Sequence, residues 1–227
     1  MSGLFVTGTD TDVGKTEVTL GLMAALQQQG FSVLGMKPVA SGGETAGSAV
    51  ACEDALRLQA QGSVQVRYDL VNPFAFVPPI APHIAAGRSG AEIELGMIRG
   101  AYDDLAAHAD WVVVEGVGGW RVPLGPALAV DDLPVGLDIP VVMVVGLRLG
   151  CLNHSLLTAE SIRARGLRLA GWVANLVDPE MLARDENIAT LAALIDAPSL
   201  GVVPWLEQPR PELVALHLRV DTLLGRV

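Results

Sequence analysis

The stretch that most constrains this chain is the loop GTDTDVGKT at residues 8–16, which lies between an apolar run at residues 4–6 and a helical pattern with apolar residues from Val18 to Leu26. The order of strand, glycine-containing loop and helix is the context that a phosphate-binding loop requires. A helix N-terminus leaves backbone N–H groups unpaired and carries a partial positive charge, so it stabilises an anion. Lys15 adds a charge that can reach terminal phosphates, and the Thr16 hydroxyl suits magnesium.

Five residues separate Gly8 from Gly14, one more than the usual spacing in such a loop. Either the loop is one residue longer, or its first glycine is dispensable. The plain alternative is a strand-to-helix turn that merely needs glycine. We favour phosphate binding because Gly-Lys-Thr stands between a strand and a helix of the right phase.

The composition excludes several classes of protein. The 227 residues are 51% hydrophobic and 18% charged, with a net charge of −10 and no basic block, which argues against a nucleic-acid partner. The mean hydropathy is +0.43, but the longest apolar run, residues 139–147, is interrupted by Pro140 and Gly146, and a membrane span needs about 20 residues. We expect one domain over residues 1–227, with two small domains as the alternative, and no contact with a membrane.

The start of the chain lacks the pattern of a secretion signal. Cys52 and Cys151 form neither a disulfide framework nor a metal-binding spacing. We therefore expect a reduced, cytoplasmic protein in which both cysteines are packing residues.

Strand-like apolar runs alternate with helical patterns along the whole chain. This alternation predicts an α/β fold with a parallel sheet covered by helices on both faces. The strands are expected at residues 4–6, 32–36, 111–115, 141–145, 169–175 and 201–203. The helices are expected at residues 16–29, 54–61, 91–108, 153–165, 180–195 and 211–223, and the proline-rich segment 71–82 is expected to cover the sheet edge or mouth.

Single polar residues end three of the strand-like runs: Lys37, Glu115 and Asn175. Ligands in parallel sheets gather beyond the carboxyl ends of the strands, so these residues are candidates for a site. Thr16, Asp54 and Glu115 could together hold magnesium, which prefers oxygen ligands. The alternative for Asp54 is a favourable charge at a helix N-terminus.

Lys37 and Ser41 form a second candidate group. With Lys15, Lys37 would bring two positive charges to a transferring phosphoryl group; alternatively, its side chain extends out of the sheet end into solvent. Residues 116–119 hold three glycines, which suit either close backbone approach to a ligand or a flexible turn. Residues 150–154 predict a second helix N-terminus with Asn153 as its cap, able to hold a carboxylate or serving as an ordinary cap.

Several motifs, in order along the chain, resemble dethiobiotin synthetase. They are GTDTDVGKT (8–16), KPVASG (37–42), NPF (72–74), APHI (81–84), VEGVGGW (114–120), LGCLNH (149–154), LAGWVAN (169–175) and PWL (204–206). The resemblance extends from about residue 5 to residue 206, and the spacing of the phosphate loop is itself a trait of that family. It implies a three-layer fold like that of P-loop NTPases, with a mostly parallel central sheet.

That family is an ATP-dependent cyclo-ligase of biotin synthesis that uses Mg²⁺. The resemblance implies that one amine of 7,8-diaminononanoate combines with CO₂ to form a carbamate. The carbamate is phosphorylated by the γ-phosphate of ATP, and the second amine closes the ureido ring of dethiobiotin with release of phosphate. A homodimer is also implied, because the helix start of a partner subunit would hold the substrate carboxylate.

The resemblance also assigns roles to residues. Lys15 and Lys37 would be catalytic, and Thr16, Asp54 and Glu115 would hold the metal. Residues expected to contact the nucleotide are Asp12, Val13, Gly14, Lys15, Thr16, Glu17, Glu115, Gly116, Gly118, Asn175, Pro204, Trp205 and Leu206. Residues expected to contact the diamine are Ser41, Gly150, Cys151, Leu152 and Asn153.

The main rival is a nucleotide-switch ATPase of the partition or metallocentre-assembly kind (ParA/Mrp-like). Those proteins carry a second lysine early in the phosphate loop, where this chain has Asp10. A small-molecule kinase is a further alternative, which would release a stable phosphorylated product.

Overall fold

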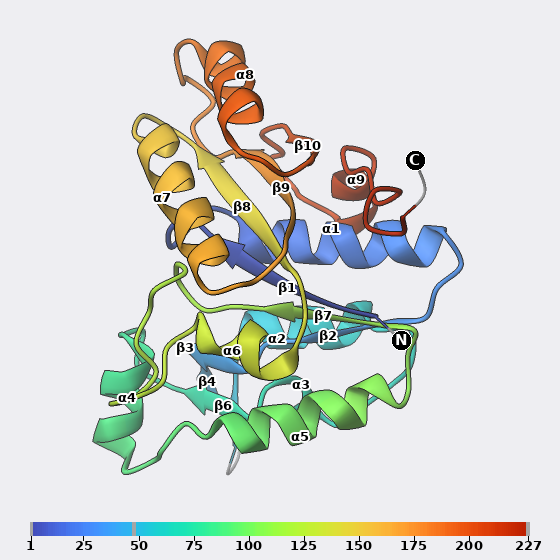
Figure 1. Cartoon of the computed structure of the whole chain (residues 1–227). Coiled ribbons are helices and arrows are strands. Elements are labelled where there is room, and N and C mark those ends of the chain that lie inside the picture. Colours follow the sequence, from blue (N-terminus) through green and yellow to red (C-terminus); the bar gives the residue numbers. More distant parts are fainter. Residues whose placement is uncertain (1, 47–48, 226–227) are drawn as a thin grey trace.

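The structure is a computed structural model that describes residues 2–46 and 49–225. Its centre is a six-stranded sheet in the order β10-β9-β8-β1-β7-β2, in which all the pairings are parallel (Figure 1). The strands are β1 (Ser2–Gly8), β2 (Val33–Met36), β7 (Trp111–Glu115), β8 (Val141–Leu147), β9 (Leu169–Leu176) and β10 (Ser199–Val203). These strands confirm the six expected apolar runs and the parallel sheet.

The sheet is apolar on both faces. Side chains along a strand point alternately to opposite faces, so a strand buried on both sides needs apolar residues at successive positions. In β1, Leu4 and Val6 pack in one hydrophobic cluster, whereas Phe5 packs in the other. In β7, Val113 and Val112 divide between the two clusters in the same way.

Helices cover both faces, which gives three layers. The buried residues of α1 (Lys15–Gln28), α2 (Glu53–Gln61) and α9 (Pro211–Ala215) join the cluster that contains Leu4. Helices on the opposite face contribute to the cluster that contains Phe5; they are α4 (Pro82–Ser89), α5 (Leu95–Ala106), α6 (Asp132–Leu137), α7 (Cys151–Ala164) and α8 (Arg184–Leu194). The short α3 (Tyr68–Val71) lies near β2 and contacts both α2 and α5.

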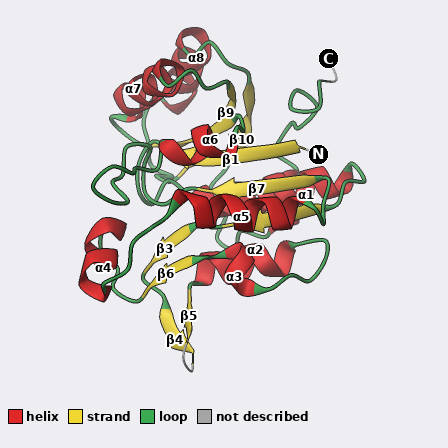
Figure 2. Ribbon diagram, turned by 60° about the horizontal axis from the view of Figure 1, so that its bottom comes forward, coloured by secondary structure: helices red, strands yellow, loops and turns green. Residues whose placement is uncertain are grey.

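Two small additions lie beside the β2 end of the main sheet. One is the parallel pair β3 (Val39–Ser41) and β6 (Phe74–Phe76), and the other is the hairpin β4 (Glu44–Ala46) and β5 (Ala49–Ala51). The hairpin projects away from the main sheet (Figure 2). The segment 71–82 thus contains a short strand, and its last residues border the pocket described below.

Some predicted helix boundaries are wrong. The helix expected at 91–108 begins at Leu95, and that expected at 180–195 begins at Arg184. The helix expected at 211–223 ends at Ala215, because the chain then turns along β10: Leu218 forms a bridge with Gly201, and the Arg219 N–H donates to the Leu200 carbonyl at 2.7 Å. Within the described residues, no helix is long and apolar enough to cross a bilayer.

The predicted cap of α7 is also wrong. This helix begins at Cys151, with Gly150 as its N-cap at φ +97° and no side-chain cap bond. Asn153 therefore lies inside the first turn. A left-handed backbone at the cap position suits glycine, so Gly150 rather than Asn153 ends the loop.

Candidate active site

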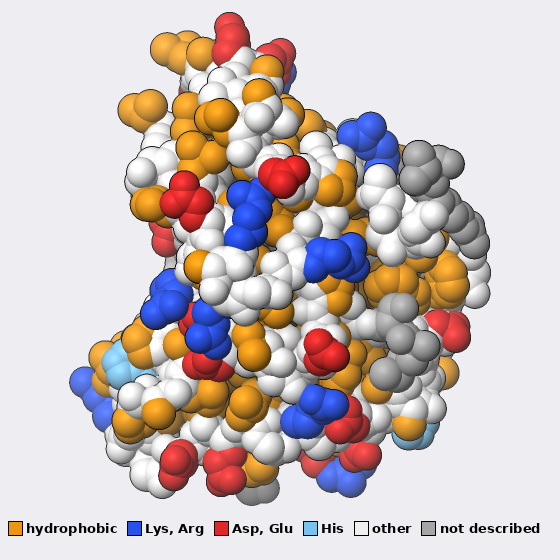
Figure 3. All heavy atoms as spheres, viewed as in Figure 1, with side chains coloured by type: hydrophobic (Ala, Val, Ile, Leu, Met, Phe, Trp, Pro, Cys, Tyr) orange, Lys and Arg blue, Asp and Glu red, His pale blue; other side chains and the backbone are white. Residues whose placement is uncertain are grey.

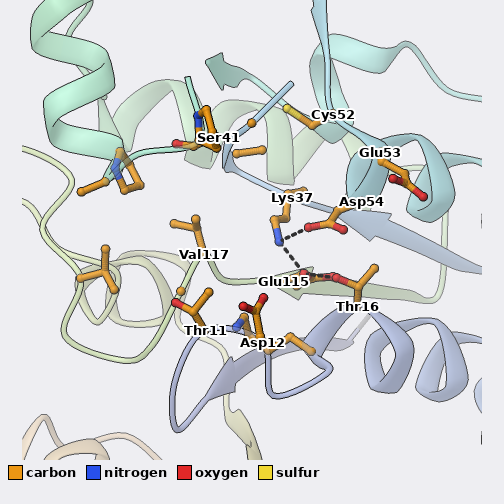
Figure 4. Close-up of a pocket in the computed structure, with 18 of the residues that line it drawn as sticks. Thr11, Asp12, Thr16, Lys37, Ser41, Cys52, Glu53, Asp54, Glu115 and Val117 are labelled. Carbon is orange, nitrogen blue, oxygen red and sulfur yellow. Dashed lines mark hydrogen bonds and ion pairs between the residues drawn. The ribbon is translucent and has the colours of Figure 1, made fainter. Parts of the chain in front are cut away.

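A cavity of about 820 Å³ opens where β1, β2 and β7 end. Its lining comes from several separate parts of the chain: the phosphate loop, the residues that follow β2, the start of α2, residues 79–82 and the loop after β7 (Figure 4). The cavity therefore lies beyond the carboxyl ends of the strands, as expected for a parallel sheet.

The phosphate loop has the backbone shape needed to present its N–H groups at the start of α1. Asp12 and Gly14 have φ values of +58° and +81°, in the left-handed region. A Cβ on Gly14 would lie 2.1 Å from Nδ2 of Asn175, and this same amide donates to the Val13 carbonyl at 2.9 Å. Glycine at position 14 is thus required both by backbone angle and by the close approach of Asn175.

Four side chains form a connected set at the base of the cavity. The Thr16 hydroxyl donates to Glu115 Oε1 at 2.8 Å, and Lys37 donates to the same carboxylate oxygen. Lys37 also donates to Asp54 Oδ2 at 3.0 Å. Figure 4 shows Lys37 reaching between these two carboxylates, with Thr16 on the far side of Glu115. The structure thus brings together the three residues expected to hold metal and one of the two expected catalytic lysines.

Adjacent strands explain the contact between Lys37 and Glu115. In the parallel pairing of β2 with β7, Met36 lies opposite Val114, so the next residue on each strand falls at the same level. The Lys37 and Glu115 side chains are 5% and 0% exposed. A buried charge requires a partner, and each of these residues supplies one for the other.

The lysines of the site differ in their acidity. Burial and the neighbouring Lys37 ammonium lower the pKa of Lys15 to about 8, although nearby carboxylates partly offset this shift. Burial alone would lower the pKa of Lys37, but Glu115 and Asp54 raise it above its ordinary value. Burial likewise opposes ionisation of Asp54, yet the Lys37 ammonium holds the pKa of that carboxyl below its ordinary value.

The donor set fits a magnesium ion. Within the described parts of the chain, no group of three or more His, Cys, Asp and Glu side chains is arranged to hold a metal. Magnesium, however, commonly takes only one or two carboxylates from the protein and completes its shell with water and substrate phosphates. Glu115 Oε2 is buried without a hydrogen-bond partner, and an orphaned carboxylate oxygen beside a hydroxyl and a second carboxylate matches the chemistry of that ion.

The other expected site residues fall into two groups. Lining the cavity are Asp12, Gly14, Lys15, Thr16, Glu17, Lys37, Ser41, Asp54, Glu115 and Gly118. Ser41 Oγ is buried without a partner, and Figure 4 shows Ser41 across the cavity from Thr16. Outside the cavity are Val13, Gly116, Asn175, Gly150, Cys151, Leu152, Asn153, Pro204, Trp205 and Leu206.

Two ion pairs next to the phosphate loop were not anticipated from the sequence. Arg57 on α2 makes a bidentate pair with Glu17 on α1, and Arg148 donates to Asp10 Oδ2 at 2.6 Å. The spacing of Arg57 three residues after Asp54 placed both on one side of α2. Nothing in the sequence identified their partners, which lie 40 and 138 positions away.

A further signal in the sequence points to the same cavity: Lys15 and Lys37 are the only lysines of the chain, whose other basic side chains are arginine and histidine. Both lysines are buried, at 7% and 4% exposed, and both line the same cavity. Lysine is rarely buried without a specific partner. The burial of both lysines in one cavity makes them candidates for chemistry or ligand binding rather than for surface solvation.

The site defines a P-loop nucleotide-binding protein. At the end of a parallel sheet it combines a phosphate loop at the start of α1, two buried lysines, and a hydroxyl with two carboxylates. Residues 2–212 match a protein family described as an AAA domain. The ATP-dependent dethiobiotin synthetase BioD of Aromatoleum aromaticum is 51% identical over 216 residues, which cover 95% of this chain and 96% of that protein. The protein of the same name from Pseudomonas aeruginosa PAO1 is 50% identical and covers 98% of both chains. The chain belongs to the ATP-dependent dethiobiotin synthetase family.

Solved structures support the fold alone. The MinD cell division protein of Aquifex aeolicus superposes with a TM-score of 0.61 at 15% identity, covering 100% of this chain and 98% of that chain. The signal recognition particle 54 kDa protein of Aeropyrum pernix, in complex with GDP, gives a TM-score of 0.55 at 16% identity over 99% of this chain and 46% of that chain. The three-layer α/β fold expected from the sequence is confirmed.

Proposed function

We propose that this chain is an ATP-dependent cyclo-ligase that makes dethiobiotin from 7,8-diaminononanoate, CO₂ and ATP. One amine adds to CO₂ and loses a proton, which gives a carbamate. A carbamate oxygen attacks the γ-phosphorus as the bond to the ADP oxygen breaks. The second amine then attacks the carbamate carbon, which closes the ureido ring and expels phosphate. The observation that most supports this proposal is that both lysines are buried and line one cavity beside the phosphate loop.

The proposed catalytic residues act by charge. A transferring phosphoryl group spreads negative charge over its oxygens, so fixed positive groups stabilise the transition state. Lys37 keeps its proton because Glu115 and Asp54 raise its pKa. Lys15 approaches from the phosphate loop, where its ammonium donates to the Asp10 carbonyl at 3.1 Å. A free amine combines with CO₂ without a strong general base, so positioning is the main remaining task.

The proposed metal ligands are Thr16, Asp54 and Glu115, whose oxygens meet at the base of the cavity. When bound there, magnesium supplies positive charge to the phosphates of ATP. Thr16 and Glu115 are held together by their hydrogen bond, and Lys37 holds Asp54 next to Glu115.

We further propose the following ligand contacts. The nucleotide is held by Asp12, Val13, Gly14, Lys15, Thr16, Glu17, Glu115, Gly116 and Gly118, and its base by Asn175, Pro204, Trp205 and Leu206. The reacting end of the diamine contacts Ser41, whose buried hydroxyl has no partner of its own. Its carboxylate is held by residues 150–153, at the start of α7, from a second subunit.

This arrangement requires a homodimer. Residues 150–153 lie outside the cavity of their own chain, and the preceding Leu149 is 97% exposed. Figure 3 shows further hydrophobic side chains gathered over α7 and α8; Leu157 and Leu194 on these helices are 57% and 56% exposed. Sedimentation of the parent chain and of Leu149→Glu tests the proposal, with dimer expected for the parent and monomer for the variant. A monomeric parent contradicts it.

Residues 1–227 are proposed to form one functional domain. A cytoplasmic location is also proposed, because the reaction consumes ATP and both cysteines are free and buried thiols.

The deciding experiment is mass spectrometry of the products formed from diamine, bicarbonate, magnesium and ATP, together with phosphate release. Dethiobiotin should appear, and phosphate release should require the diamine. Fast ATP hydrolysis that is indifferent to diamine indicates a nucleotide switch instead, and a stable phosphorylated product indicates a kinase. The switch is disfavoured because Asp10, bound to Arg148, occupies the place of its second lysine.

A further inference from the structure

A bidentate ion pair joins α1 to α2 at the edge of the cavity. Arg57 donates through Nη1 to Glu17 Oε1 at 2.6 Å and through Nη2 to Glu17 Oε2 at 2.8 Å. The two side chains are 33% and 24% exposed, and both residues line the cavity. Two parallel hydrogen bonds between planar groups fix orientation as well as distance. The pair therefore constrains how the two helices lie relative to each other at the cavity.

The pair stands next to two of the three proposed metal ligands. Glu17 directly follows Thr16 on α1, and Arg57 lies three residues after Asp54, on the same side of α2. Thr16 and Asp54 enter the cavity from these two different helices (Figure 4). Their separation consequently depends on the packing of α1 against α2.

The far ends of the same helices are joined by glutamines. Gln27 Nε2 donates to the Gln61 carbonyl at 2.7 Å, and Gln61 Nε2 donates to Gln27 Oε1 at 2.7 Å. Between the two ends, Met23 of α1 and Leu58 of α2 are fully buried against β2. With the far end and the middle fixed in this way, loss of the Glu17–Arg57 pair would affect chiefly the end of α2 that carries Asp54. The remaining polar ties there include the Lys37–Asp54 ion pair and the bond from the Cys52 N–H to the Tyr68 hydroxyl.

We propose that the Glu17–Arg57 pair is a positioning element that sets the distance between Asp54 and Thr16 and thereby the affinity of the site for magnesium. The inference rests on the proposed metal role of these two residues. Magnesium demands nearly octahedral geometry at short oxygen distances, so a small shift of one donor weakens binding. The phosphate loop lies between β1 and α1, so we expect it to bind nucleotide without metal independently of the position of α2.

The test uses Arg57→Gln, which removes the ion pair and leaves Glu17 in place. Loss of a positive charge beside the cavity would by itself strengthen the binding of a cation, so weaker metal binding cannot come from the altered charge. The matched control is Arg99→Gln, which removes the basic partner of an exposed pair on α5 away from the cavity. Arg57→Lys is the conservative variant; it keeps the charge without the two-pronged geometry.

The readout is the affinity for a non-hydrolysable ATP analogue, measured by calorimetry with Mg²⁺ and again with EDTA. The ratio of the Kd in EDTA to the Kd with Mg²⁺ reports how much the metal contributes to nucleotide binding. In Arg57→Gln this ratio should fall about 10-fold, the lower end of the loss seen when residues supporting metal ligands are removed. The Kd of Arg57→Gln in EDTA should stay within about twofold of the parent. The ratio for Arg57→Lys should lie between the ratios for the parent and for Arg57→Gln.

Three outcomes overturn the proposal. An unchanged ratio in Arg57→Gln shows that the pair does not position a metal ligand. An equal loss with Mg²⁺ and with EDTA shows that it supports the phosphate loop instead. A lower melting temperature with an unchanged ratio shows a purely structural role. Asp54→Asn separates this inference from the proposed function: if that variant keeps the parental ratio, the metal assignment itself is wrong.

Discussion

Lys37 and Glu115 stand at the same level on the neighbouring strands β2 and β7, and their side chains form a buried ion pair. The pair also touches Thr16 and Asp54, so both of these side chains are held by one ammonium and one carboxylate. Breaking a buried pair leaves an uncompensated charge. The two residues are thus expected to affect both chemistry and folding, and the experiments must separate the two effects.

Lys37→Ala should lower kcat by roughly 10²–10³-fold, the size of effect seen when one group that stabilises developing charge is removed. ATP binding should largely survive, because Lys15, Thr16 and the loop N–H groups remain. Diamine-dependent phosphate release measures kcat, and nucleotide titration measures ATP binding. Circular dichroism gives the folded fraction of the variant, to which both values are normalised. The exposed Arg99→Gln serves as the control. Turnover near that of the parent refutes the catalytic role of Lys37.

Glu115→Gln should raise the magnesium concentration needed for half-maximal activity by about 10-fold or more, as expected for the loss of a charged ligand. Glutamine keeps the volume of the side chain and can still accept from Thr16, so the change is mainly one of charge. The measurement is phosphate release as a function of magnesium at saturating diamine and ATP. A curve that superimposes on that of the parent removes Glu115 from the metal site.

Gly14→Ala should destabilise the folded chain by about 1–2 kcal/mol through the left-handed backbone alone, and further through collision with Asn175. Nucleotide affinity should fall with it, because the loop must shift. Chemical unfolding and calorimetry check the two effects. Gly100→Ala in α5 is the control: no atom lies within 4 Å of its new Cβ, and alanine should stabilise that helix by about 0.5–1 kcal/mol. Equal stability changes at both positions contradict the interpretation of the loop.

Asp110 gives a prediction about pH. The Ser32 hydroxyl and N–H both donate to Asp110 Oδ2, at 2.7 and 2.9 Å, and these bonds lower the pKa of Asp110. The folded state therefore holds this proton less tightly than the unfolded state. The resulting stability is present at neutral pH and is lost as the pH falls below the ordinary value of 3.8 and through the depressed pKa.

Asp110→Ala should accordingly melt at a lower temperature than the parent at pH 7, with the difference narrowing towards about pH 3. Ser32→Ala, which removes the hydroxyl donor but keeps the N–H, should show a smaller difference of the same kind. Thermal unfolding at several pH values makes the comparison. A gap in melting temperature that stays constant with pH means that the hydrogen bonds do not act through ionised Asp110.

The six strands were predictable because strands buried on both faces read as unbroken apolar runs, as in residues 111–115 and 141–145. The short elements were not. Strand β6 is three residues long and follows Pro73, and α6 is six residues long and contains Pro134 and Gly136. Neither element is long enough to show a repeated strand or helix pattern. The helix expected beyond Ala215 fails because the pairing of Leu218 with Gly201 outweighs local helical preference.

The candidate site was predictable where it depends on single positions at strand ends. Lys37 and Glu115 follow apolar runs directly, and parallel strands bring such ends to one edge. The Glu17–Arg57 pair was not predictable in this way, because it depends on the side-by-side packing of two helices and on the rotamers of two long side chains. The contact of Glu17 with the nucleotide stays a prediction. Because Arg57 engages the Glu17 carboxylate, we propose that the backbone of Glu17 makes that contact.

The confinement of both lysines to the cavity has a practical consequence for labelling the protein. Reagents that acylate primary amines find only the α-amino terminus, Lys15 and Lys37. Of the two side chains, Lys15, with a pKa of about 8, offers far more free amine at mildly alkaline pH. Attachment of the protein to a sensor surface through either lysine would therefore block the cavity itself. The part of an amine-directed fluorescent label that bound nucleotide excludes would count the functional sites in a preparation.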